Sequence, residues 1–164
     1  VIGDLEVRVL GPLRRYVSPN DESIVLDVDV GGMSVLLAGD VETWAQADLG
    51  PLRREVLKVP HQGAATSDPD WLTASAGRLS VISVGENDFG HPAAWVVHVL
   101  EAAGSVVCRT DRGGDVVVVP GPDGPRVTAG CEPPSGNASQ HVRLRGDHQG
   151  TAVAGRSGLA AHGA

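Results

Sequence analysis

The segment Ser23-Ile24-Val25-Leu26-Asp27-Val28-Asp29-Val30-Gly31-Gly32-Met33-Ser34-Val35-Leu36-Leu37-Ala38-Gly39-Asp40 contains two apolar runs separated by two glycines. The first run alternates apolar and polar residues, which predicts a strand over residues 23–30 with one buried face. Gly31-Gly32 is typical of a tight hairpin turn, so we expect residues 33–38 to form a second strand that pairs antiparallel with the first. Gly39-Asp40 ends that second strand.

Alternating strand and helix patterns continue on both sides of this hairpin and predict an α/β fold, with a mixed sheet covered by helices on one face. The strand pair at the end of the series is expected to close across the turn at residues 111–114. The amphipathic segments lack a second layer to pack against, so the chain looks like the C-terminal half of a larger unit. The further predicted elements are strands over 5–10, 55–59, 79–84, 105–109 and 115–119, and helices over 41–49, 69–76 and 92–103.

The composition predicts one folded domain over residues 1–120 and a disordered tail over residues 121–164. Glycine and proline make up 13 of the 44 tail residues, and the tail has no aromatic residue. Such a segment cannot bury enough apolar area to offset the entropy of ordering it. We see no signal peptide and no transmembrane helix, so the chain as it stands is expected to be soluble.

The formal net charge of −7 argues against broad electrostatic capture of nucleic acid. It does not exclude a phosphodiester substrate, because bound divalent cations would invert the charge locally. Cys108 and Cys131 lack the spacing of a metal site and do not fix the redox compartment. Cys108 is expected to be a small buried residue of a strand.

Three loops carry side chains that could hold a metal or move a proton. Asp40, His61 and His91 each follow a predicted apolar strand. A carboxylate and two imidazoles delivered to strand ends are typical of a hydrolytic metal site. Asp40 also has a simpler interpretation as the N-cap of the following helix, and His61 as a surface histidine without a role.

His91 lies just before a predicted helix, whose N-terminus would favour anions. His91 could bind a phosphate or transfer a proton to a leaving oxygen. The alternative is that it only marks the junction between the loop and the helix. Asn87 and Asp88 are expected to form turns, with Asp88 as a second choice for a site residue.

The order of these motifs closely resembles the metallo-β-lactamase-like domain of ComEC-type DNA-internalisation competence proteins. The resemblance covers roughly residues 3–119, which is nearly all of the predicted folded part. The motifs that carry it are Asn20-Asp21-Glu22-Ser23-Ile24-Val25-Leu26, Leu36-Leu37-Ala38-Gly39-Asp40-Val41-Glu42, Leu57-Lys58-Val59-Pro60-His61-Gln62-Gly63, Ile82-Ser83-Val84-Gly85, Asn87, Gly90-His91-Pro92, and Arg109-Thr110-Asp111 with Gly113 or Gly114.

The resemblance implies a metallo-β-lactamase-like αββα sandwich of which this chain holds the C-terminal half. It implies that Asp40 is a metal-bridging aspartate, that His61 is a metal ligand, and that His91 contacts the substrate or its phosphate. The implied cofactor is a dinuclear zinc or manganese site. The implied substrate is DNA, either single-stranded or the strand that is not imported, in a membrane-associated protein with the domain on the extracytoplasmic side. No stable homo-oligomer is expected.

Two departures from the family pattern limit the expected activity. The family usually has His-His-Gly-Ser where this chain has His61-Gln62-Gly63-Ala64, and the upstream H-x-H-x-D-H ligand cluster is absent. We therefore expect a metal-dependent hydrolase of the nuclease type whose isolated chain is weak or inactive. The alternatives are a free-standing hydrolase of the same fold acting on an ester, lactone or thioester, and a degenerate remnant without catalysis.

Overall fold

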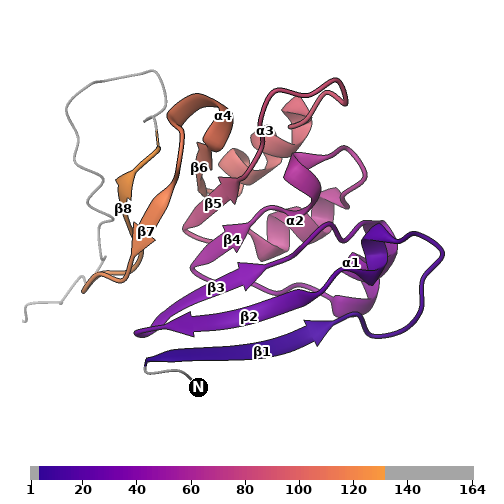
Figure 1. Cartoon of the computed structure of the whole chain (residues 1–164), viewed down its shortest axis with the longest axis horizontal. Helices are drawn as coiled ribbons and strands as arrows, with labels where there is room; N and C mark the ends of the chain where they lie inside the picture. The colour runs from indigo at the N-terminus through magenta and orange to yellow at the C-terminus, as the bar shows by residue number, and fades with distance from the viewer. Residues whose placement is uncertain (1–3, 132–164) are drawn as a thin grey trace, which may run out of the picture.

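The computed structural model describes residues 4–131, which form a mixed six-stranded sheet, a separate two-stranded sheet and four α-helices (Figure 1). The strands of the large sheet follow one another in chain order, and the first three are antiparallel while the last four are parallel. This confirms the predicted α/β class. The strands are β1 (Leu5–Gly11), β2 (Val25–Val30), β3 (Met33–Leu37), β4 (Val56–Lys58), β5 (Leu79–Ile82), β6 (Val106–Arg109), β7 (Val117–Val119) and β8 (Arg126–Ala129).

The predicted hairpin is present. Val30 pairs with Met33, and the two glycines between them have φ values of +56° and +85°. A side chain would be strained at both turn positions, which explains why Gly31-Gly32 fixes the register of β2 and β3. The sequence Ser67-Asp68-Pro69 is typical of a helix N-cap followed by a first-turn proline. This cap forms, because the carboxylate of Asp68 accepts a hydrogen bond of 2.7 Å from the backbone N–H of Trp71.

Three helices cover one face of the sheet. They connect β3 to β6 in sequence, and right-handed crossovers between neighbouring parallel strands place every helix on the same side. Their apolar side chains meet those of the strands in one core, which includes Leu36, Leu57, Leu72, Val96 and Leu100. The helices are α1 (Thr43–Leu49), α2 (Pro69–Ser75), α3 (Ala94–Ala102) and α4 (Thr110–Gly113), of which α4 lies after β6; the short 3-10 helices are η1 (Asn20–Glu22) and η2 (Pro60–Gly63).

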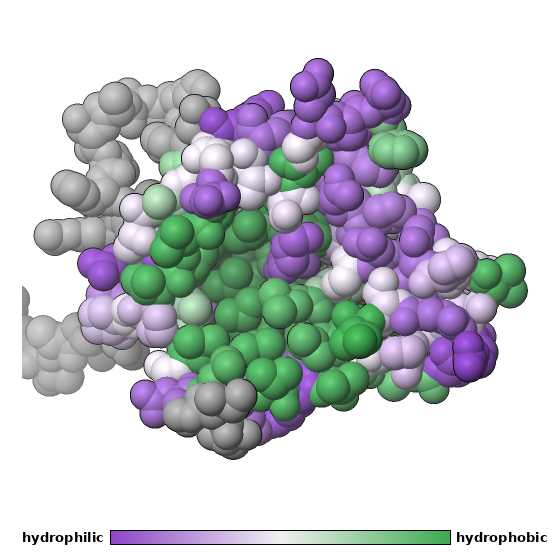
Figure 2. All heavy atoms as spheres, viewed as in Figure 1, coloured by the Kyte–Doolittle hydropathy of each residue, from purple (hydrophilic) through white to green (hydrophobic). Residues whose placement is uncertain are grey.

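The opposite face of the sheet is also apolar but carries no helix. Figure 2 shows hydrophobic residues gathered over the strands on the side that faces the viewer. Strand alternation assigns one polar residue, Lys58, to this face. Val7, Val9 and Leu37 are exposed there. The other apolar residues of the face are Leu5, Leu26, Val28, Val30, Met33, Val35, Val56, Leu79, Val81, Val106 and Cys108.

The predicted pairing of the strands at residues 105–109 and 115–119 is wrong. Strand β6 pairs with β5 in parallel, and β7 pairs antiparallel with β8. The segment between β6 and β7 has turn-forming residues, but it folds into the helical turn α4 and carries the chain away from the sheet edge. The β7–β8 hairpin then packs on part of the apolar sheet face.

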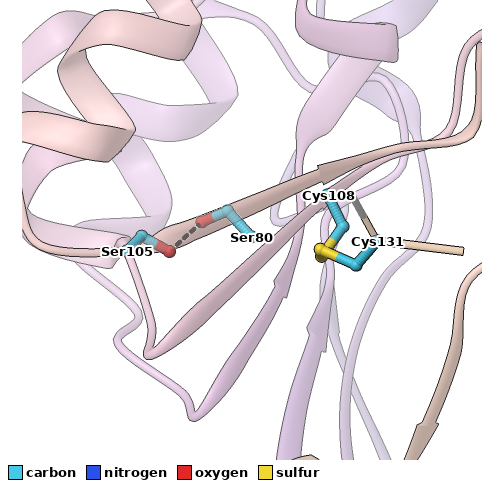
Figure 3. Close-up of a disulfide and its surroundings, with 4 residues drawn as sticks. All are labelled: Ser80, Ser105, Cys108 and Cys131. Atoms are coloured by element: carbon cyan, nitrogen blue, oxygen red, sulfur yellow. Dashed lines mark hydrogen bonds between the residues drawn. A yellow bond between two sulfur atoms is a disulfide. The ribbon is translucent and has the colours of Figure 1, made fainter. Parts of the chain in front are cut away.

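Residues 121–131, which composition assigned to the tail, include β8 and Cys131. Cys131 forms a disulfide with Cys108 of β6, which ties the end of the hairpin to the sheet (Figure 3). Cys108 is buried in its strand as expected, but as half of a disulfide. The remainder of the predicted tail, residues 132–164, lies outside the described residues.

Candidate functional site

The candidate residues lie in loops at one edge of the sheet. Strands β3, β4 and β5 are parallel neighbours, so their carboxyl ends meet at the same edge, and the loops that follow them carry Asp40, His61 and His91. Backbone hydrogen bonds join the three loops. The N–H of His61 donates to the carbonyl of Gly39 at 3.1 Å, and the N–H of Ala93 donates to the carbonyl of Gly63 at 2.9 Å.

Asp40 is exposed and does not cap α1. The N-cap position of this helix is occupied by Glu42, and the buried carboxylate of Asp21 accepts hydrogen bonds from the backbone N–H groups of Glu42 and Ala45. The simpler interpretation of Asp40 is therefore not what the structure shows. Within residues 4–131, no hydrogen bond or ion pair involves the Asp40 carboxylate.

The backbone before Asp40 is held tightly. Gly39 has φ +58°, and a Cβ atom at this position would lie 2.8 Å from Cβ of Ser23. The hydroxyl of Ser23 accepts a hydrogen bond of 3.1 Å from the N–H of Asp40. Only glycine fits this close approach, so the position of the carboxylate is set by rigid backbone.

His61 and Gln62 both adopt the left-handed backbone conformation, with φ values of +46° and +53°. Residues other than glycine rarely do so, and each such residue costs about 1–2 kcal/mol. Gly63 follows with φ +78°, and a Cβ atom there would lie 2.7 Å from Cβ of Pro92. The strained turn thus brings the loop after β4 against the loop after β5, and such strain is characteristic of functional sites.

The ring of His61 is mostly buried against Glu42. Nδ1 of His61 lies 3.3 Å from Oε1 of Glu42, and the side chains of the two residues are 23% and 19% exposed. Nδ1 is fully buried and makes no hydrogen bond among the described residues. The distance allows a hydrogen bond after a small rotation of the ring, because the present N–H direction is poorly aligned.

Glu42 is itself held by other side chains. Its carboxylate accepts hydrogen bonds from Ser18 at 3.0 Å and Asn20 at 3.2 Å. Burial acts to raise the pKa of Glu42, but hydrogen bonds from Thr66, Asn20 and Ser18, together with the nearby His61, lower this pKa below its ordinary value. Glu42 is therefore a carboxylate at neutral pH and favours a proton on Nδ1 of His61.

Lys58 is the charged group nearest to these residues on β4. Burial lowers the pKa of its ammonium group, while the charge of Asp40 acts to raise it. The ammonium group donates a hydrogen bond of 3.0 Å to the carbonyl of Val59. Lys58 can therefore offset part of the negative charge of Asp40.

His91 lies beside His61, with ring centroids 5.4 Å apart in an edge-to-face arrangement. Its loop is shaped by Asn87, whose side-chain oxygen accepts a hydrogen bond of 3.0 Å from the N–H of His91 and whose amide donates 2.9 Å to the carbonyl of His91. The predicted turn role of Asn87 is confirmed. The structure thus brings the two histidines together.

The donor set suits part of a metal site. An exposed carboxylate that has no partner among residues 4–131 and an imidazole beside a carboxylate are the oxygen and nitrogen donors that zinc and manganese accept. Within residues 4–131, however, no group of three or more His, Cys, Asp or Glu side chains is arranged to hold a metal ion. Asp40 and His61 therefore fit one part of a ligand set.

Sequence reasoning assigned no role to Glu42, Asp21 or Phe89. Two of them lie in motifs that the sequence analysis quoted. Glu42 comes two residues after the candidate ligand Asp40, and Asp21 comes two residues before the predicted strand at 23–30. These positions are the sequence signal that could have indicated a role for each. Phe89 is an apolar residue in a polar loop, and a lone apolar residue of this kind is too common to mark a site from sequence alone.

No protein-family model matches the chain. The chain is 31% identical over 122 residues to ComE operon protein 3 of Bacillus subtilis strain 168, and 33% identical over 108 residues to competence protein ComA of Neisseria gonorrhoeae. These alignments cover 70% and 62% of the chain but only 16% of each relative, so the chain spans about one sixth of their length. The chain is therefore distantly and partially similar to competence proteins of the ComEC family.

Proposed function

We propose that this chain is the C-terminal part of the metallo-β-lactamase-like domain of a ComEC-type protein, and that the complete domain hydrolyses DNA during competence. The observations that support the proposal are that the loops carrying Asp40, His61 and His91 meet at one sheet edge, and that the chain is similar to two competence proteins. The proposal includes the substrate, which is single-stranded DNA or the strand that is not imported, and the metal, which is zinc or manganese.

The apolar sheet face supports the fold assignment. A soluble protein rarely exposes such a surface, and one of this kind marks a contact with another layer of structure. The β7–β8 hairpin packs on one part of the face, while Val7, Val9 and Leu37 stay exposed on β1 and β3. We infer that a second sheet packs here and completes an αββα sandwich.

In this domain Asp40 and His61 would hold divalent zinc or manganese together with ligands from outside this chain. Such an ion lowers the pKa of bound water and neutralises phosphate charge. Glu42 lies 3.3 Å from Nδ1 of His61, which would leave Nε2 of the ring as the metal-binding nitrogen. Gly39 fixes the backbone from which the Asp40 carboxylate projects. The ammonium group of Lys58 offsets part of the negative charge of Asp40 when no metal ion is bound.

We propose that His91 acts on the substrate. Its ring touches His61, and Asn87 fixes its backbone from both sides. An imidazole in this position can donate a hydrogen bond to a phosphate oxygen or give a proton to the leaving oxygen. Phe89 stacks on the His91 ring, and this contact favours the present orientation of the imidazole.

The disulfide favours a location outside the cytoplasm. Disulfides such as Cys108–Cys131 form and persist in oxidising compartments. Among residues 4–131, no helix is long and apolar enough to cross a membrane. We propose that this domain lies on the extracytoplasmic side and that membrane-spanning segments belong to other parts of the parent protein.

Metal titration of the chain tests the site. Calorimetry with Zn²⁺ and Mn²⁺ should show binding that is lost in Asp40→Ala and His61→Ala and retained in the control Asp70→Ala. Nuclease activity of the chain alone should be negligible with either metal, because part of the ligand set is missing. Equal binding by Asp40→Ala and the unmodified chain would contradict the proposal and would favour the degenerate remnant.

The coding sequence upstream would distinguish the proposed DNA-uptake protein from the alternative, a free-standing hydrolase of an ester, lactone or thioester. Hydrophobic membrane spans encoded there would support the DNA-uptake protein. A short soluble start that contains H-x-H-x-D-H would support the free-standing enzyme.

A further inference from the structure

The chain's single phenylalanine is one of its most exposed apolar residues. Phe89 lies in the loop between β5 and α3, and the residue is 83% exposed. A buried phenylalanine would stabilise the fold, whereas this one contributes little to the core. A lone exposed apolar residue is common on protein surfaces, so what distinguishes Phe89 is its ordered loop and its contact with His91.

The loop that presents Phe89 is built around a single amide side chain. The oxygen of Asn87 accepts hydrogen bonds from the N–H groups of Phe89 at 3.1 Å and His91 at 3.0 Å. Its amide nitrogen donates to the carbonyls of Gly85 and His91, both at 2.9 Å. These four bonds use the full capacity of the amide oxygen and both its N–H donors, so the ring is held out by a preorganised loop.

The Phe89 ring also has a defined orientation. It stacks on the imidazole of His91 with centroids 5.8 Å apart and an interplanar angle of 22°. His91 in turn contacts His61 edge to face. One face of the Phe89 ring is therefore directed toward His91, and the exposed surface includes its outer face, a few ångströms from the candidate catalytic residue.

We propose that Phe89 is a stacking platform for an unpaired nucleobase of a single DNA strand whose phosphate lies at His91. This inference rests on the proposed function and names the form of the substrate, because a base inside a duplex has no free face to stack. Stacking on aromatic rings binds single strands without sequence preference, since every base has a π-face.

The charge of the chain favours stacking over capture through phosphates. The formal net charge is −7, so the long-range field repels a polyanion. Stacking of a base gains its free energy from contact with the ring, although the field still opposes the approach of the strand. Placing the base beside His91 also fixes the neighbouring phosphate, which is the positional accuracy that hydrolysis requires.

The test is binding of a short oligothymidylate to the whole chain, measured by NMR titration in the presence of a chelator. The ring and amide signals of Phe89 should shift with the oligothymidylate and stay in place with an abasic strand of equal length. Phe89→Ala should weaken binding about fivefold or more, whereas Phe89→Trp should bind as well as the unmodified chain or better.

Phe89→Leu is the matched control for the aromatic face, because it keeps most of the apolar volume. It should lose binding like Phe89→Ala, while Leu13→Ala, which removes a different exposed apolar side chain, should change nothing. Full binding by Phe89→Leu would show a plain apolar contact and overturn the proposal. Absence of binding by the unmodified chain, or equal binding of abasic and normal strands, would overturn it too.

The chelator separates this proposal from the hydrolytic one. Stacking is measured without divalent metal, so a failure of Asp40 and His61 to bind metal leaves this readout unchanged. Conversely, the chain could bind metal through Asp40 while the NMR signals of Phe89 do not shift with oligothymidylate. That result would be compatible with the hydrolytic proposal and would refute the stacking platform.

Discussion

The carboxylate of Glu42 lies 3.3 Å from Nδ1 of His61 and is held in place by Ser18 and Asn20. These residues come from the segment before β2, the start of α1 and the loop after β4. A carboxylate that engages one ring nitrogen of a histidine fixes its tautomer and leaves the other nitrogen free as a ligand. The packing of these three segments therefore sets the environment of the His61 imidazole.

Replacing Glu42 should change the tautomer of His61. In the unmodified chain, ¹⁵N NMR of the imidazole should show the proton on Nδ1 at neutral to mildly alkaline pH. In Glu42→Ala this preference should be lost, and Zn²⁺ affinity should fall about 10- to 100-fold, measured by calorimetry. Glu101→Gln on the exposed side of α3 is the control and should alter neither quantity. A proton on Nε2 in the unmodified chain would contradict the assigned role.

The ion pair between Asp27 and Arg54 should make folding stability depend on pH. The guanidinium donates to both carboxylate oxygens, at 2.6 and 2.7 Å, and this hydrogen bonding lowers the pKa of Asp27 below its ordinary value despite burial. The stabilisation is complete above about pH 4, the ordinary Asp pKa. It is lost as the pH falls through the lower pKa of the folded state.

Asp27→Asn should therefore reduce the free energy of unfolding by roughly 1–2 kcal/mol at pH 7, and the difference should vanish in acid. Urea unfolding at a series of pH values measures both effects. Asp4→Asn, which alters an exposed carboxylate at the start of β1, should have no comparable effect. A difference that stays constant down to the acid limit would mean that packing, not charge, explains the loss.

The sequence predicted those parts of the fold that local signals specify. The hairpin followed from Gly31-Gly32, and the start of α2 followed from Asp68 before a proline; both are short-range rules of backbone geometry. The face covered by helices followed from strand–helix alternation. The apolar pattern on the other face also indicated a missing layer, and the structure leaves part of that face exposed.

Contacts between distant segments were not predictable in the same way. The pairing of β7 with β8 and the Cys108–Cys131 disulfide depend on how the chain leaves the sheet edge, which no local pattern encodes. Asp40, His61 and His91 could be proposed from their residue types and their motifs. The left-handed backbone of His61 and its contact with Glu42 could not, because both arise from tertiary packing around the turn.

Removal of the disulfide should destabilise the chain and loosen the β7–β8 hairpin. The two cysteines are separated by 23 residues, and a closed loop of this size contributes about 3 kcal/mol in the chain-entropy account. Cys131→Ser should show this loss in urea unfolding, with faster hydrogen exchange in β7 and β8. A reducing agent should have the same effect on the unmodified chain and none on the variant. Unchanged exchange in the hairpin would show that packing alone holds it on the sheet.

Gly63 should tolerate substitution poorly. A Cβ atom there would lie 2.7 Å from Cβ of Pro92 at a φ of +78°, so Gly63→Ala must push the loop after β5 away from His61. We expect a loss of about 1–3 kcal/mol in the free energy of unfolding and altered His91 ring signals in NMR spectra. Gly85→Ala is the matched control, because its Cβ would meet nothing within 4 Å. Equal stability of the two variants would refute the claim that this contact holds the two histidine loops together.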